Sequence, residues 1–213
     1  MKPESLLKKN QNFLIILSAP SGGGKTTILQ EVLKRHQDVE YSISYTTRPP
    51  RGDEENGRHY HFVDEKEFLR RREAGDFLET ALVFDRWYGT SLSFIKSRLS
   101  AGKHVIMDID VQGAAQIHPT SVPCVKIFIL PPTLEILRQR LIDRDTDAPQ
   151  EIEKRLKTAR KELEYIPDYE YLVENDDLDL AVQKVLAIIQ AEENRIERYP
   201  SPAADFLKTE KMK

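Results

Sequence analysis

The chain has 213 residues, of which 39% are hydrophobic and 31% charged, and its formal net charge is −3. This length supports one substantial core, and the near balance of charge argues against a general nucleic-acid binder, which is usually clearly basic. The single cysteine, Cys124, excludes a disulfide framework and suits a reducing compartment. The apolar stretch Phe13–Leu17 is far too short to span a bilayer, so we expect a cytoplasmic protein that does not enter a membrane.

Strands and helices alternate from the start of the chain. The apolar run "FLIILSA" has the length of a strand and predicts one buried on both faces, followed by a helix from about Lys25 to Arg35. In "DEKEFLRRREAG", Asp64 and Glu67 have the spacing of a capping box, so we expect a helix that stops at Gly75.

The same alternation continues along the second half of the chain. In "TSLSFIKSRLSAG" we expect a helix capped by Thr90 or Ser91 and stopped by Gly102. Buried strands are expected in "HVIMDID", "CVKIFIL" and "YEYLVEN", and helices in "TLEILRQRLIDR", "DAPQEIEKRLKTARKELEYI" and "LDLAVQKVLAIIQAEENRI". Strands separated by helices indicate an α/β sheet with right-handed crossovers, while residues 1–10 and 200–213 are expected to be disordered.

The strongest local signal is "SAPSGGGKTT", at the first junction between strand and helix. It follows the phosphate-loop template and ends in Gly24-Lys25-Thr26, with Ala19 in place of the template's first glycine. Lys25 can reach the β- and γ-phosphates of a nucleoside triphosphate, and the Thr26 hydroxyl can hold Mg²⁺. The alternative is a simple glycine-rich turn. The predicted nucleotide-phosphate site comprises Ala19, Pro20, Ser21, Gly22, Gly23, Gly24, Lys25, Thr26 and Thr27.

A second anion site is indicated by "SISYTTRPPRGDEENGRHYHF". Arg48 and Arg51 carry planar cations that can fork onto phosphate oxygens, and Tyr60 and Tyr88 offer hydroxyl donors. A solvated, charged hairpin is the alternative interpretation of this stretch.

Four stretches, "SYTTRPPRGDEENGRHYHFV", "FLETALVFDRWYGTS", "VIMDIDVQG" and "IEKRL", resemble guanylate kinases in order and spacing, and the resemblance covers the chain from about Phe13 to Glu192. It implies Mg²⁺-dependent transfer of a phosphoryl group from ATP to GMP. It also implies an α/β fold with a phosphate-loop NTPase core on a parallel sheet, a small mixed-sheet GMP-binding lobe and a helical lid. The core would comprise residues 1–43, 91–139 and 166–213, the lobe residues 44–90, and the lid residues 140–165.

The resemblance also assigns residues to GMP. Guanine offers two donors, N1–H and the N2 amine, on one edge, and Glu79 matches the family's carboxylate that faces this edge. Adenine lacks both donors and would leave the carboxylate unpaired. The family usually has serine where Thr90 stands, but a hydroxyl remains. The resemblance implies that the base contacts Ser44, Glu79, Thr90 and Asp108, and that the phosphate contacts Arg48, Arg51, Tyr60 and Tyr88.

Asp108 and Asp110 lie two apart at the end of a predicted strand, so we expect them on one face of the sheet. Asp108 is assigned to the guanine side by the resemblance. For Asp110 a role near Mg²⁺ or the phosphate loop and a role as a turn or capping residue both remain open.

The lid arginines Arg140, Arg144 and Arg155 match family positions that close over ATP. Asp145 stands where the family often has glycine, which leaves the detailed lid geometry open. Asn175 matches an asparagine near the adenine, although a simple turn before the last helix is an alternative. The catalytic cations implied by the resemblance are Lys25, Arg48, Arg140, Arg144 and Arg155.

Three rival functions are weighed against a kinase for GMP and dGMP. They are a guanylate-kinase-like scaffold module that binds proteins, a kinase for another small phosphorylated acceptor, and a phosphate-loop GTPase. The complete Gly24-Lys25-Thr26 and the lid arginines argue against a scaffold module. The predicted base-reading residues argue against a kinase for another acceptor, and the second anion site argues against a GTPase. The sequence leaves a homo-oligomer open.

Overall fold

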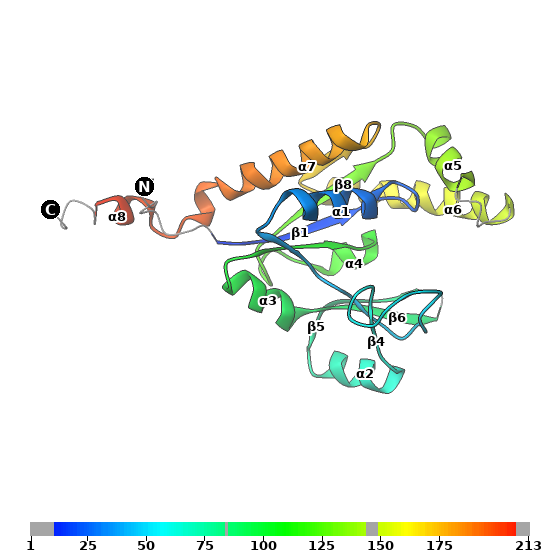
Figure 1. Cartoon of the computed structure of the whole chain (residues 1–213), viewed down its shortest axis with the longest axis horizontal. Coiled ribbons are helices and arrows are strands. Elements are labelled where there is room, and N and C mark those ends of the chain that lie inside the picture. The colour runs from blue at the N-terminus through cyan, green and yellow to red at the C-terminus, as the bar shows by residue number, and fades with distance from the viewer. Residues whose placement is uncertain (1–10, 84, 144–148, 208–213) are drawn as a thin grey trace.

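The computed structural model describes residues 11–83, 85–143 and 149–207. Its main sheet has five strands in the order β2-β7-β1-β8-β9, and every neighbouring pair is parallel. Figure 1 shows this sheet at the centre of the molecule, with helices on both of its faces. The strands are β1 (Leu14–Ser18), β2 (Val39–Tyr41), β7 (His104–Asp108), β8 (Cys124–Leu130) and β9 (Tyr171–Glu174).

Two apolar clusters fill the space between the main sheet and its helices. Strand β1 contributes to both because alternate side chains point to opposite faces: Ile15 and Leu17 join one cluster, and Leu14 and Ile16 join the other. All five residues of β1 are buried, which confirms the strand predicted from its continuous apolar run. The first cluster is covered by α1 (Lys25–Arg35) and α7 (Leu178–Glu193), and the second by α3 (Leu92–Ser100) and α4 (Val111–Gln116).

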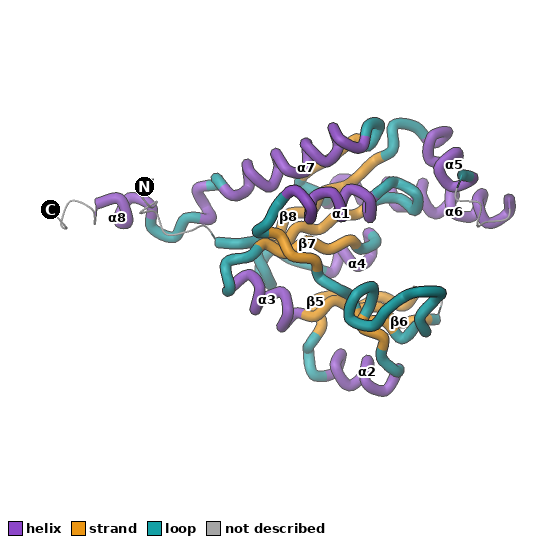
Figure 2. Tube along the Cα trace, viewed as in Figure 1, coloured by secondary structure: helices purple, strands orange, loops and turns teal. Residues whose placement is uncertain are grey.

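A smaller lobe is built on a mixed sheet of four strands in the order β4-β3-β6-β5. The pair β3–β4 is parallel, and the other two pairs are antiparallel. Figure 2 shows the strands of this lobe in orange, below the main sheet. Helix α2 (Glu65–Glu73) covers this sheet and begins where Asp64 accepts a hydrogen bond from the Glu67 backbone, as its capping-box spacing predicts. The strands are β3 (Tyr45–Thr46), β4 (His61–Phe62), β5 (Phe77–Val83) and β6 (Arg86–Ser91).

Two further helices, α5 (Leu134–Ile142) and α6 (Pro149–Glu162), pack together through a small cluster of their own. The segment predicted as a helical lid, residues 140–165, begins inside α5 and contains α6. Its role as a lid stays a prediction. A 3₁₀ helix (Leu163–Asp168) leads from α6 to β9. The cluster between the two helices contains Leu137, Leu141, Ile152, Leu156 and Ala159.

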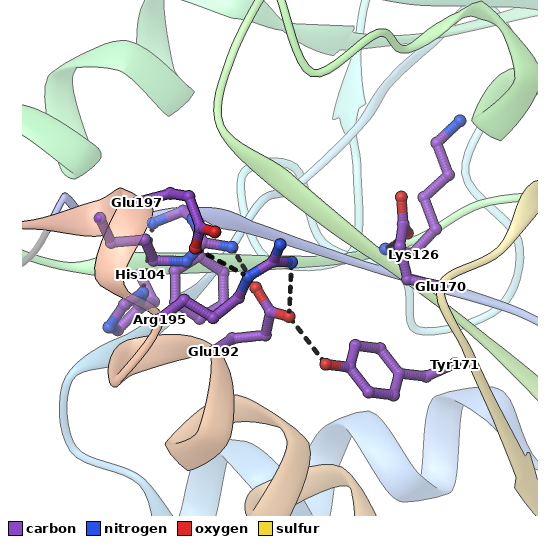
Figure 3. A network of polar contacts seen from close by, with 9 residues as sticks. His104, Lys126, Glu170, Tyr171, Glu192, Arg195 and Glu197 are labelled. Carbon is purple, nitrogen blue, oxygen red and sulfur yellow. Dashed lines mark hydrogen bonds and ion pairs between the residues drawn. The ribbon is translucent and has the colours of Figure 1, made fainter.

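The last described residues extend beyond α7 at the end of the molecule opposite α5 and α6 (Figure 1). They form a 3₁₀ helix (Ile196–Arg198) and α8 (Pro202–Leu207), so the prediction of disorder from residue 200 is wrong for α8. Glu192 of α7 fastens this segment to the core, since its carboxylate accepts hydrogen bonds from Tyr171 of β9 and from Arg195 (Figure 3). No helix in the described ranges is long and apolar enough to cross a membrane.

Candidate active site

The loop between β1 and α1 has a backbone that only small residues can build. Gly24 caps α1 in the left-handed region, with φ of 91°. A Cβ at Gly24 would lie 2.2 Å from Asn175 Nδ2, so both the backbone angle and the space demand glycine. Gly23 donates its N–H to the Pro20 carbonyl at 2.8 Å, and a Cβ there would lie 2.9 Å from the Ala19 Cβ. This is the tight turn that a phosphate loop requires.

Lys25 and Thr26 point from the first turn of α1 toward the end of β7. Lys25 Nζ donates to the Ile109 carbonyl at 3.5 Å, and the Thr26 hydroxyl donates to Asp108 Oδ2 at 3.2 Å. A hydroxyl beside a carboxylate is a pair of hard oxygen donors, the ligand type that Mg²⁺ prefers. The residues at this point therefore fit the magnesium ion that the sequence predicted at Thr26.

A cavity of about 350 Å³ opens on the outer side of the loop. Arg140 Nη2 donates to the Asn175 carbonyl at 2.8 Å, while its Nη1 is buried without a hydrogen-bond partner among the described residues. Asn175 Nδ2 donates to the Gly23 carbonyl at 2.9 Å, so this buried asparagine braces the loop and does more than form a turn before α7. The cavity is lined by Gly22, Gly24, Thr27, Arg140, Asp143, Asn175, Asp176 and Leu178.

A second cavity, of about 240 Å³, lies between the small lobe and the end of β7. Five of the residues predicted to contact the acceptor line it, although they come from distant parts of the chain: Ser44, Tyr60, Glu79, Tyr88 and Asp108. Asp110 and Gly113, from the start of α4, complete the wall opposite β5. The fold therefore brings three of the four predicted base-reading residues to one pocket, while the fourth, Thr90, does not line it.

Glu79 is the buried carboxylate of this second cavity, with 6% of its surface exposed. Burial raises the pKa of Glu79 to about 7, and hydrogen bonds from Thr90 oppose that rise only in part. The Thr90 hydroxyl donates to Glu79 Oε1 at 2.7 Å. Thr90 is itself fully buried, so it holds the carboxylate from behind. A carboxylate so placed can accept two hydrogen bonds from a ligand that offers paired donors.

Arg48 is buried beside the same cavity, with its guanidinium 5.3 Å from the centre of the Tyr60 ring. The rings of Tyr60 and Tyr88 are 6.0 Å apart, so these three predicted phosphate contacts form one group. Arg51 differs: its side chain is exposed and does not line the cavity, while its backbone N–H donates to Glu54 at 2.8 Å.

The two aspartates at the end of β7 have separate positions. Asp108 ends the strand and accepts hydrogen bonds from Thr26 and from the Tyr41 hydroxyl, the latter at 3.0 Å. Asp110 lies beyond the strand and caps α4 by accepting from the Gly113 N–H at 2.8 Å. The expectation that one strand carries both is therefore wrong, although both side chains line the second cavity, and the capping interpretation of Asp110 is correct.

Glu162, at the end of α6, is a residue of this region that the sequence did not single out. Burial raises the pKa of its carboxyl group, although nearby Lys25 and a hydrogen bond from the Ser21 backbone oppose the rise. Arg155 is half-buried on the same helix. Arg144 and Asp145 lie outside the described residues.

Together, the fold and the two cavities define the class of protein. A phosphate loop follows the central strand of a parallel sheet, and a second pocket, which contains a buried carboxylate and has a buried arginine beside it, opens at the same edge. Asp108 joins them, because it bonds Thr26 of the loop and lines the second pocket. This arrangement is that of a phosphate-loop kinase with separate sites for donor and acceptor.

Comparisons with known proteins identify the family. The sequence profile described as guanylate kinase matches residues 11–192. A guanylate kinase from Caldanaerobacter subterraneus subsp. tengcongensis is 46% identical over 190 residues, covering 89% of this chain and 92% of the relative. One from Legionella pneumophila is 40% identical over 202 residues, covering 95% and 97%. The crystal structure of guanylate kinase from Anaplasma phagocytophilum has a TM-score of 0.75 at 30% identity, covering 92% of this chain and 93% of that one.

The chain belongs to the guanylate kinase family. It is a nucleoside monophosphate kinase, which phosphorylates GMP with ATP.

Proposed function

We propose that the phosphoryl group passes from ATP directly to the phosphate of GMP, or of dGMP, at the edge where the two cavities meet. The observation that carries this proposal is the position of Asp108, which bonds the phosphate loop and lines the acceptor pocket. An acceptor phosphate is already anionic at neutral pH, so the reaction needs no general base to activate it. Catalysis then rests on positioning and on stabilising the charge of the transferring group.

ATP is assigned to the phosphate loop and the cavity beside Asn175. The backbone N–H groups of residues 19–27 and the dipole of α1 receive the phosphates. Mg²⁺ would be held by the Thr26 hydroxyl, with Asp108 beside it, and would supply charge neutralisation for the triphosphate. The cations that stabilise the transferring group are Lys25, Arg48, Arg140, Arg144 and Arg155.

GMP is assigned to the second cavity with its base toward Glu79. Ser44 and Asp108 lie on the cavity wall and can complete the hydrogen bonds to guanine, while Thr90 fixes the carboxylate. The GMP phosphate is assigned to Arg48, Arg51, Tyr60 and Tyr88. Because Arg51 is exposed in the structure, this assignment requires its side chain to turn toward the bound phosphate.

The cytoplasm is the compartment that we propose for this reaction, since Cys124 is a free thiol and the chain suits reducing conditions. The net charge of −3 gives no support for a nucleic-acid partner. A homo-oligomer stays a prediction.

Lys25→Ala tests the division into two sites. We expect it to abolish ADP formation while GMP binding, measured by calorimetry, stays within about twofold of the original, because Lys25 faces the donor phosphates only. Lys34→Ala, on the same helix but exposed and paired with Glu31, is the matched control and should leave turnover unchanged. Equal loss of turnover and of GMP binding in Lys25→Ala would contradict separate sites.

A further inference from the structure

Glu54 is an acidic residue that bonds Arg48 beside the acceptor pocket and has no role in the proposed phosphoryl transfer. It ends a tight turn, in which its backbone N–H donates to the Arg51 carbonyl at 3.0 Å and Gly52 takes a φ of 50°. Its carboxylate bonds back to the same turn, since Oε2 accepts from the Arg51 N–H at 2.8 Å. The carboxylate is therefore held in position by its own segment.

Both oxygens of the same carboxylate accept hydrogen bonds from Arg48. Arg48 Nη1 donates to Glu54 Oε2 at 2.8 Å, and Nη2 donates to Oε1 at 2.9 Å. Nη1 also donates to the Pro49 carbonyl at 2.8 Å. This ion pair holds the pKa of Glu54 down at about 2, so the carboxylate stays ionised throughout the neutral range.

These hydrogen bonds occupy the Nη1/Nη2 edge of the Arg48 guanidinium and leave its Nε/Nη2 edge available to a ligand. A guanidinium has five N–H donors, and Glu54 and Pro49 take both on Nη1 and one on Nη2. The Nε–H and the outer N–H of Nη2 form a second planar fork, which matches two oxygens of a phosphate. The hydrogen bonds from Arg48 to Glu54 and Pro49 use Nη1 and Nη2, and neither partner bonds to Nε.

Aromatic groups fix the orientation of the guanidinium from other directions. It lies 5.3 Å from the centre of the Tyr60 ring and 5.8 Å from that of Phe62. The Tyr88 hydroxyl also lies within hydrogen-bond reach of it. Tyr60 and Tyr88 line the acceptor cavity, so Arg48 is held beside the place assigned to the GMP phosphate.

We propose that Glu54 is a positioning residue, which fixes Arg48 through its Nη1/Nη2 edge so that the Nε/Nη2 edge receives the acceptor phosphate. The inference rests on the proposed GMP site and deepens it. It opposes a second interpretation, in which Glu54 stands in for the phosphate and must leave before GMP binds. The geometry favours positioning, because Glu54 and a phosphate can use different edges of Arg48 at the same time.

Glu54→Gln tests the proposal, because it keeps the size of the side chain but breaks the paired acceptance from Arg48. Dissociation constants for GMP and for guanosine, which lacks the phosphate, are measured by calorimetry on the full chain. We expect Glu54→Gln to raise the dissociation constant for GMP about tenfold, because the variant loses charge-assisted hydrogen bonds. Guanosine affinity, the KM for ATP and the melting temperature should stay unchanged. Glu55→Gln is the matched control, since Glu55 is an exposed neighbour paired with Arg58.

A second background separates positioning from direct contact. In Arg48→Ala, the further change Glu54→Gln should have no effect on GMP affinity, because Glu54 acts only through Arg48. Unchanged or tighter GMP binding by Glu54→Gln alone would overturn the proposal, as would an equal loss of guanosine binding and thermal stability. If the original chain binds GMP no better than guanosine, the phosphate site itself is wrong, and that failure is visible before any variant is made.

Discussion

Glu79 carries a carboxyl group that the fold holds away from water beside Thr90. Because its pKa is about 7 in the free protein, a large share of it is protonated at neutral pH. A ligand that donates two hydrogen bonds favours the ionised form, so binding of guanine must lower this pKa and release a proton. The same carboxylate that recognises guanine therefore makes recognition depend on pH.

We expect the affinity for guanosine to fall about tenfold from pH 8 to pH 6, because the free site must lose its proton before it binds. Guanosine is the right ligand, since its lack of a phosphate removes a second group that titrates in this range. Calorimetry across this range measures the effect. Glu79→Gln should bind more weakly and without this slope, and a slope retained in that variant would assign the titration to another group.

At this scale, the sequence predicts residues that belong to a local pattern. Lys25 and Thr26 follow from the phosphate-loop spacing, and Glu79 follows from the resemblance. Tyr41 and Glu162 could not be predicted from the sequence. Tyr41 bonds Asp108, which is 67 positions away, and Glu162 lies against the phosphate loop. Such contacts arise from the fold, and no spacing along the chain encodes them.

Among the elements, α4 acts as the far wall of the acceptor pocket. Its residue Gly113 faces Glu79, and a Cβ there would lie 3.0 Å from Glu79 Oε2. Gly113 has no left-handed backbone to demand glycine, so the reason for glycine here is space for the carboxylate. The carboxylate is the flexible end of a side chain, so an added methyl group should move it.

Gly113→Ala is expected to raise the KM for GMP about tenfold or more, since small displacements of a positioning group are costly. The melting temperature should not fall, because alanine favours a helix over glycine. Steady-state kinetics and thermal unfolding measure the two effects. Gln112→Ala, on the exposed side of α4, serves as the control. Normal GMP kinetics in Gly113→Ala would show that Glu79 does not need this space.

Clear start and stop signals predict where helices lie, and at some ends the bounding residue as well. Helix α1 spans the predicted Lys25–Arg35, and Ser91 caps α3 as one of the two expected residues. Strand β2 and helix α4 could not be predicted from periodicity, because three and six residues are too few to show a period. The strands of the small lobe were expected only through the family resemblance.

On the scale of the whole molecule, a buried ion pair ties the C-terminal segment to the sheet. Glu192 is 1% exposed and pairs with Arg198, whose guanidinium lies 4.0 Å from the centre of the Phe13 ring. Burial works against ionisation of Glu192, but hydrogen bonds from Arg198 and Tyr171 outweigh it and hold its pKa below the ordinary value. This pair therefore stabilises the fold above the ordinary pKa of a glutamate, and the contribution is lost as pH falls through the lowered value.

We expect Arg198→Met to lower the free energy of unfolding by about 3–5 kcal/mol, because it leaves Glu192 buried without its main partner. Chemical denaturation measures this loss. Arg195→Met is the control: Arg195 contacts the same carboxylate but is half-exposed, so we expect a loss below about 1 kcal/mol. KM values should not change in either variant, and a change in them would mean that the segment reaches the active site.

The recognition of guanine by Glu79 is tested most directly by measuring acceptor selectivity with and without this carboxylate. ADP release is measured with MgATP and, in parallel, GMP, dGMP, AMP, CMP and UMP, for the original chain and for Glu79→Gln. We predict that the original chain prefers GMP over AMP by about 10⁴ in kcat/KM, and that Glu79→Gln loses most of this preference while its KM for ATP stays unchanged. An unaltered preference for GMP in Glu79→Gln would contradict the assignment of guanine to this carboxylate.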